Sequence, residues 1–122
     1  MLNEGAPEPG GHRALGFTHI SDGKVLPFLQ IDCDRLAALL GPPKAAEPLA
    51  RREAMFGRAL ARILAHEMYH VIGETQGHNK HGLAKPTLTA QELISDWIGF
   101  EREDLDLIEE KIEESMPDVM TR

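Results

Sequence analysis

The residues with the clearest chemical potential are His66, Glu67 and His70, which form the pattern His-Glu-x-x-His. Two histidines four residues apart on a helix lie on the same side, one turn apart, and can bind one metal ion. Glu67 lies about 100° around the helix from His66. From there its carboxylate can take a proton from water that the metal activates. The motif therefore predicts a zinc (Zn2+) site with Glu67 as a general base.

A catalytic zinc site needs a third protein ligand, since the fourth position is left for water. The candidates all follow His70: His78 and His81 in a predicted loop, and Glu92 or Asp96 on a later predicted helix. We favour His78, because a turn at Gly73 would let a short loop bring its imidazole back to the helix. Glu92 is the main alternative, although it also fits the capping box of its own helix. If His81 is not the third ligand, it would hydrogen-bond the substrate or the reaction oxyanion, or be an ordinary loop histidine.

The two motif histidines lie near the end of a long helix predicted from about residue 48 to residue 72. Its apolar residues recur at helical spacing and form one stripe: Leu49, Phe56, Leu60, Ile63, Leu64 and Val71. Its arginines are predicted to form a solvated face: Arg51, Arg52, Arg58 and Arg62. We expect Gly73 to adopt the left-handed conformation that ends the helix.

The elements before this helix are predicted to be a tail, a hairpin and a short helix. Residues 1–12 are rich in Gly and Pro and are predicted to be a flexible tail, followed by a single domain over 13–118. Alternating apolar residues predict strands over 13–20 and 25–31. Asp22-Gly23 between them is a turn signal and favours an antiparallel hairpin. A helix through Leu40 follows, capped by Asp32 or Asp34.

The C-terminal part is predicted to be one more helix. Thr89-Ala90-Gln91-Glu92 is a capping box, and the helix is expected to run on to about residue 114. Its inner side is expected to carry Leu93, Ile94, Trp97, Ile98, Leu105, Ile108 and Ile112. The predicted fold class is therefore α+β, with a short antiparallel sheet packed on the long helix that bears the motif, and a C-terminal helix.

Composition limits the partners that we expect. The chain has 122 residues and a net charge of -7, which argues against a nucleic-acid partner because phosphate binding needs a basic surface. No apolar run is long enough for a membrane helix, so no membrane insertion is expected. The first residues lack the features of a signal peptide, which predicts a cytoplasmic protein, or a secreted one if the true start lies upstream. The sequence does not define an oligomeric state.

The run His66-Glu67-x-x-His70-x-x-Gly73 resembles the start of the metzincin motif of zinc peptidases, His-Glu-x-x-His-x-x-Gly-x-x-His. Metzincins take their third ligand six residues after the second histidine, where this chain has Gln76, and His78 follows two residues later. Roughly residues 13–97 are also similar to small bacterial metzincin-like proteins. The resemblance implies a zincin-like domain and a zinc-dependent peptidase that acts on a peptide or protein. Its zinc ligands would be His66, His70 and His78, with Glu67 as the base.

Several alternatives stay open at this point. Metzincins place a methionine turn beneath the metal, but after the loop this chain has only Met116 and Met120, so Leu83 or Met116 would have to supply the apolar floor. A gluzincin-like site, with Glu92 as third ligand, is the alternative peptidase. The alternative from another class is a non-catalytic zinc-binding domain that serves structure or a protein contact. Tyr69, inside the motif, is expected to pack against neighbouring elements rather than stabilise an oxyanion.

Overall fold

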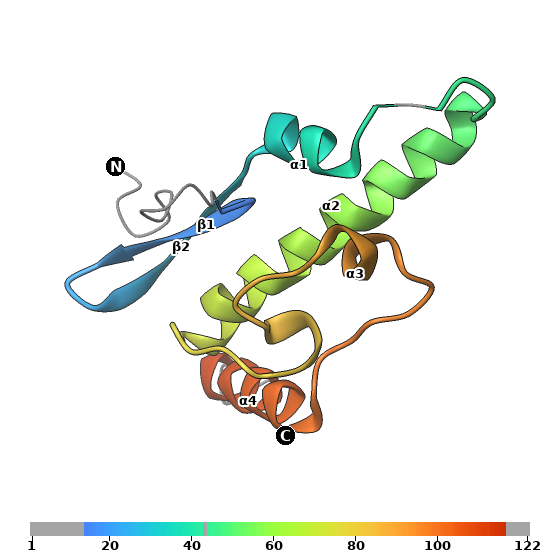
Figure 1. Ribbon diagram of the computed structural model, residues 1–122. Coiled ribbons are helices and arrows are strands. Elements are labelled where there is room, and N and C mark those ends of the chain that lie inside the picture. The colour runs from blue at the N-terminus through green and yellow to red at the C-terminus, as the bar shows by residue number, and fades with distance from the viewer. Residues whose placement is uncertain (1–13, 43, 117–122) are drawn as a thin grey trace.

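The computed structural model describes residues 14–42 and 44–116, so the predicted tail 1–12 lies outside the described residues. The elements are β1 (Gly16–Ser21), β2 (Lys24–Ile31), α1 (Cys33–Leu40), α2 (Leu49–Gly73), the 3-10 turn η1 (Gly82–Ala84), α3 (Ala90–Ile94) and α4 (Arg102–Ser115). Figure 1 shows α2 as the long central element, with the hairpin, α1, α3 and α4 arranged along it. The predicted α+β class, a two-stranded antiparallel sheet on a long helix with a C-terminal helix, is confirmed.

The hairpin forms where the turn signal predicts it. β1 and β2 pair antiparallel, from Gly16 opposite Ile31 to Ser21 opposite Lys24. The two turn residues, Asp22 and Gly23, have φ values of 52° and 74°. A two-residue hairpin turn needs these positive values so that its twist matches that of the strands. β1 and β2 both pack against α2 and bring one strand close to the histidine motif.

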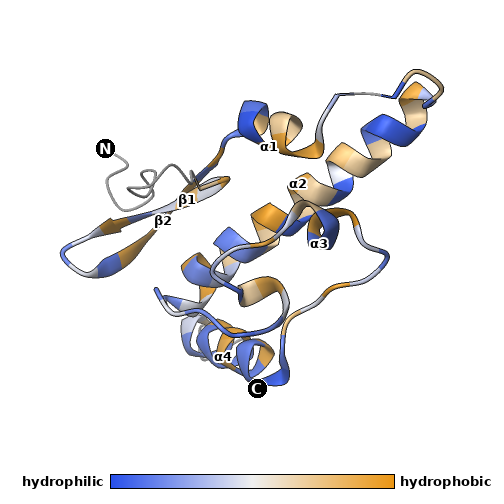
Figure 2. Cartoon of the chain, viewed as in Figure 1, coloured by the Kyte–Doolittle hydropathy of each residue, from blue (hydrophilic) through white to orange (hydrophobic). Residues whose placement is uncertain are grey.

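The core lies where α1, α2 and α3 meet. Its buried members are Leu36, Ala59, Ile63 and Leu93. Figure 2 shows apolar residues on α1 and on the middle of α2, beside α3. The predicted stripe on α2 is only partly correct, because Leu49 and Leu64 are 71% and 39% exposed. α1 is capped by Asp32, whose Oδ1 accepts a hydrogen bond of 2.9 Å from the Arg35 backbone N.

The end of α2 differs by one residue from the prediction. Gly73 is the last helical residue, and Glu74 adopts the left-handed conformation with φ 50° and ψ 46°. Gly73 instead allows close packing, since a Cβ atom there would lie 3.2 Å from Leu107 Cδ2 on α4. The glycine thus serves the contact between α2 and α4, and the backbone N–H groups of Glu74 and Thr75 close the helix end.

The prediction of one continuous C-terminal helix is wrong. The capping box is present, with Thr89 and Glu92 bonded reciprocally, but α3 ends at Ile94 and α4 begins at Arg102. The intervening segment is held by a tertiary hydrogen bond of 2.9 Å from Leu83 N to Gly99 O. This bond joins the segment to η1, and the chain between α3 and α4 is not helical. Trp97, predicted to be in the core, lies in this segment and is 80% exposed.

The end of α3 is stabilised by an arginine that the pattern had placed on a solvated face. Arg62 Nη1 donates to the carbonyl oxygens of Glu92 and Ser95, at 3.0 and 2.6 Å. The last carbonyl groups of a helix lack partners within it, so Arg62 satisfies them from α2. Within the described residues, no helix is long and apolar enough to cross a membrane.

Candidate metal centre

Three histidines converge at the C-terminal end of α2. One ring nitrogen from each of His66, His70 and His78 lies within 4.8 Å of the others. The His70 ring centroid lies 4.9 Å from those of both His66 and His78. His66 and His70 are buried in α2, whereas His78 is exposed on the loop that follows. The structure therefore brings together the three histidines that the sequence analysis favours as metal ligands.

Backbone carbonyl groups orient the two buried rings. His66 Nδ1 lies 2.6 Å from Leu83 O, and His70 Nδ1 lies 2.8 Å from Thr75 O. Because a carbonyl oxygen only accepts, each Nδ1 carries the proton and each Nε2 is left with a free lone pair. Metal-binding histidines are commonly fixed in this way. The sequence analysis missed both contacts, since a backbone acceptor leaves no signature in the residue type.

The donor set fits a divalent transition-metal ion. Neutral imidazole is a preferred zinc ligand, and three histidines form an open catalytic site. Nitrogen atoms around tetrahedral zinc lie about 3.4 Å apart at the usual bond lengths. The nitrogens of the cluster lie within 4.8 Å of one another, and His78 is exposed. The site therefore has the ligand type that such an ion requires.

The surroundings of His66 and His78 favour neutral imidazoles. Burial lowers the pKa of His66, and the nearby His70 lowers it further. The hydrogen bond that His66 donates to the Leu83 carbonyl oxygen raises the pKa and opposes both effects. Burial also lowers the pKa of His78, together with the charges that His70 and His66 would carry. Both rings thus stay unprotonated, and able to bind a metal, to a lower pH than an ordinary histidine.

We expect zinc affinity to be nearly constant from about pH 8 down to the ordinary histidine pKa of 6.5, and to fall at lower pH. A lowered pKa means that protons displace the metal only below that value. The two histidine shifts should make the metal-free fold lose stability over the same acidic range, because the unfolded chain protonates these rings first, whereas the raised pKa of Glu67 acts in the opposite direction. Competition with a fluorescent zinc chelator measures the affinity. A steep loss already between about pH 8 and pH 7 would contradict this expectation.

Glu67 lies beside the cluster in a buried position. Its Oε1 accepts a hydrogen bond of 2.6 Å from Thr18 Oγ1 on β1, and its Oε2 lies 3.9 Å from His66 Nε2. Burial raises the pKa of Glu67, against the opposing effects of the Thr18 hydrogen bond and of His70 and His78. A raised pKa moves a carboxyl group toward the range in which it exchanges protons near neutral pH. This arrangement suits a general base.

The loop that carries His78 is bonded to the hairpin turn and to η1. Gln76 Nε2 donates to Gly23 O in the hairpin turn at 3.1 Å. Asn79 N donates to Ala84 O in η1 at 2.9 Å. Gln76, at the position where metzincins have their third histidine, thus points to the hairpin, and the longer loop delivers His78 instead.

A buried polar group anchors the same loop to α4. Asp104 is 5% exposed, and its two carboxylate oxygens lie 3.3 and 3.2 Å from Asn79 Nδ2. Burial raises the pKa of Tyr69, and the charge of Asp104 and its hydrogen bond with the tyrosine hydroxyl raise it further. The Tyr69 ring packs on Phe100 at a centroid distance of 5.6 Å. Tyr69 therefore has the packing role that the sequence analysis expected.

Replacing Asp104 with alanine should destabilise the fold by about 2 kcal/mol, because the partly buried Asn79 amide and the Tyr69 hydroxyl lose their acceptor. Asp104→Asn should cost less, since its amide oxygen can still accept. Urea denaturation measures the change in the free energy of unfolding. Glu103→Ala, an exposed acid in the same turn of α4, is the matched control and should change stability little. Equal losses for the two alanine variants would contradict the anchoring role.

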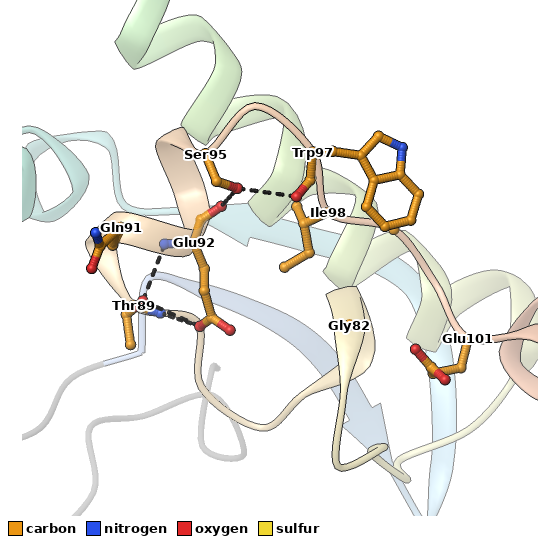
Figure 3. A pocket seen from close by; sticks show the side chains of 9 residues that line it. Gly82, Thr89, Gln91, Glu92, Ser95, Trp97, Ile98 and Glu101 are labelled. Carbon is orange, nitrogen blue, oxygen red and sulfur yellow. Dashed lines mark hydrogen bonds between the residues drawn. The ribbon is translucent and has the colours of Figure 1, made fainter.

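The other proposed third ligands lie outside the cluster, whose members among the described residues are the three histidines. Glu92 is engaged by Lys85 Nζ at 2.5 Å and by Thr89 N at 2.9 Å, and the bond from Lys85 lowers its pKa most. Figure 3 shows Glu92 reaching back to Thr89, in a pocket of about 500 Å³ that none of the three histidines lines. Asp96 is exposed and lies 3.9 Å from Arg58. His81 is exposed at the start of η1.

Of the two residues considered for an apolar floor, Leu83 is in contact with the cluster. Leu83 is 7% exposed, and its carbonyl oxygen accepts a hydrogen bond from His66. Met116 follows the end of α4 and is 42% exposed. Met120 lies outside the described residues.

Comparison with known proteins gives no relative: no family model, no curated protein and no solved structure matches the chain. What the structure itself defines is an α+β domain whose long helix carries two histidines of a possible three-histidine metal site.

Proposed function

We propose that the protein is a metzincin-like zinc peptidase, with His66, His70 and His78 as metal ligands and Glu67 as the general base. The observation that carries the proposal is the placement of Glu67. Its Oε2 lies 3.9 Å from the Nε2 atom of His66, beside the cluster but outside the set of nitrogens that converge. A purely structural metal site has no need of a buried carboxylate in that position.

In this proposal the three histidines bind the metal and Glu67 transfers the proton. Bound zinc would supply a Lewis acid that polarises the substrate carbonyl group and lowers the pKa of water. Glu67 takes a proton at Oε2 and later returns it to the leaving amine. Leu83 O and Thr75 O hold His66 and His70 with their Nε2 atoms toward the site. The buried surroundings of Glu67 limit competing water and strengthen these interactions.

The proposed substrate is a peptide or protein in extended conformation. The described sheet has two strands, so each strand has one edge without a partner strand. An extended peptide can bind such an edge by backbone hydrogen bonds, which bring it alongside the elements that hold Glu67. The acidic charge of the chain disfavours a nucleic-acid substrate.

A comparison of the zinc-loaded and metal-free protein tests this function. Each form is incubated with a mixed-sequence peptide library, and new termini are identified by mass spectrometry. We expect cleavage by the zinc-loaded protein, loss of cleavage with a chelator, and recovery on addition of zinc. Stoichiometric zinc binding without cleavage of any library peptide would reject the peptidase.

That result would favour the second candidate, a non-catalytic zinc-binding domain. The supporting observation is that the cluster joins α2 to the loop of residues 74–84, which contains few apolar anchors. A metal there would cross-link the two segments and add binding free energy to folding. Under this candidate zinc raises the thermal unfolding temperature, and Glu67→Gln changes nothing except local stability.

A further inference from the structure

Strand β1 passes directly over Glu67. Thr18 Oγ1 donates to Glu67 Oε1 at 2.6 Å, and the two residues are 8% and 6% exposed. Two residues earlier, Gly16 leaves room for the carboxylate: a Cβ atom there would lie 3.0 Å from Glu67 Cγ and 3.1 Å from Oε2. One strand therefore both binds one carboxylate oxygen and borders the other.

This contact bears on whether Glu67 acts as a base or binds the metal itself. Carboxylate oxygens are themselves good zinc ligands, and a fourth protein ligand closes a catalytic site. Glu67 Oε2 lies 3.9 Å from His66 Nε2, so it is near enough that a modest side-chain movement would reach an ion held by the histidines. If the fourth coordination position of the metal is to stay open, some feature of the protein must prevent Glu67 from binding there.

We propose that Thr18 and Gly16 are positioning residues that keep Glu67 as a base and prevent it from becoming the fourth metal ligand; this rests on the proposed function. The Thr18 hydroxyl fixes Oε1 on the side of β1. The absence of a side chain at Gly16 lets the carboxylate lie against the strand instead of being pushed toward the histidines. The backbone at Gly16 does not itself require glycine, because its φ is not in the left-handed region.

The first test uses Thr18→Val, which removes the hydroxyl at nearly constant volume, and Thr18→Ser, which keeps it. Each protein is loaded with Co2+, whose visible absorption reports the ligands, and titrated with azide, which binds an open position. We expect azide to bind wild type and Thr18→Ser with similar midpoints. In Thr18→Val, Glu67 competes for that position, so the azide midpoint should rise by about tenfold or more.

The double variant Thr18→Val/Glu67→Gln separates ligand competition from general damage. A neutral amide is a much weaker metal ligand than a carboxylate, so azide binding should return to the wild-type midpoint. In the peptide assay, kcat should fall in Thr18→Val with little change in KM, and Thr18→Ser should restore it. A midpoint that stays high in the double variant would overturn the proposal.

Gly16→Ala provides a second route if Thr18→Val does not fold. Its methyl group should displace the Glu67 carboxylate, raise the azide midpoint and lower kcat, without loss of bound cobalt. Gly57→Ala on α2 is the matched control, because a Cβ atom there meets nothing within 4 Å. Gly57→Ala should leave the azide midpoint and kcat unchanged. Identical azide binding by wild type, Thr18→Val and Gly16→Ala would overturn the positioning role, whereas a wild-type protein that binds azide but cleaves no peptide rejects only the peptidase.

Discussion

Replacing His78 with alanine is expected to lower zinc affinity by about a hundredfold or more, while the protein stays folded. The free energy of zinc binding in four-ligand sites is about 10–16 kcal/mol, so loss of one ligand removes several kcal/mol. His78 is exposed, so its side chain contributes little to the core and the fold should tolerate alanine. Isothermal titration with a competing chelator measures the affinity, and circular dichroism verifies the fold.

The control for this variant lies three residues further along the same loop. His81 is exposed and outside the cluster, so His81→Ala should bind zinc like wild type. Glu92→Ala should also retain zinc, although it loses the Lys85 contact and the capping box. Zinc retained in His78→Ala but lost in Glu92→Ala would instead establish the gluzincin-like arrangement.

Glu67→Gln is expected to retain zinc and to lose peptide hydrolysis by on the order of 10²–10⁴-fold in kcat. Glutamine has nearly the same shape, and its amide oxygen can still accept the hydrogen bond from Thr18. It cannot take a proton, so the catalytic step should fail while the three imidazoles are undisturbed. Zinc content by atomic absorption and cleavage of the best library peptide measure the two properties separately.

Glu53→Gln, an exposed change of the same type on α2, serves as the control for the loss of one negative charge. It should leave both properties unchanged. Wild-type rates in Glu67→Gln would exclude Glu67 as the base. Loss of zinc in that variant would mean that Glu67 itself holds the metal, which would also contradict the role assigned to Thr18.

Several features of the fold could be predicted because they depend on residues that are close in sequence. A four-residue spacing places His66 and His70 on one side of any helix. Asp22-Gly23 favours a tight hairpin through its own backbone preferences, and the Thr89–Glu92 capping box is complete within four residues. These elements are confirmed, because local sterics and local hydrogen bonds are sufficient to form them.

Errors arose where a distant partner overrides the local pattern. The helical spacing after Thr89 predicts one long helix, but Gly99 O accepts from Leu83 N, and α3 stops at Ile94. Glycine is the residue that most often takes the left-handed conformation at a helix end, but here Gly73 stays helical and lies close to Leu107 on α4. Both outcomes depend on segments that fold back from elsewhere in the chain.

The same division applies to the candidate site. The sequence by itself determined the pair His66 and His70 and the position of Glu67 between them. Only the tertiary structure brought His78 to the pair, through a loop anchored by Asp104 and the hairpin turn. It also supplied the Leu83 carbonyl and the Thr18 hydroxyl, 17 and 49 residues from their partners. Contacts at such separations depend on how whole elements pack, and residue types along the chain do not encode that packing in any short pattern.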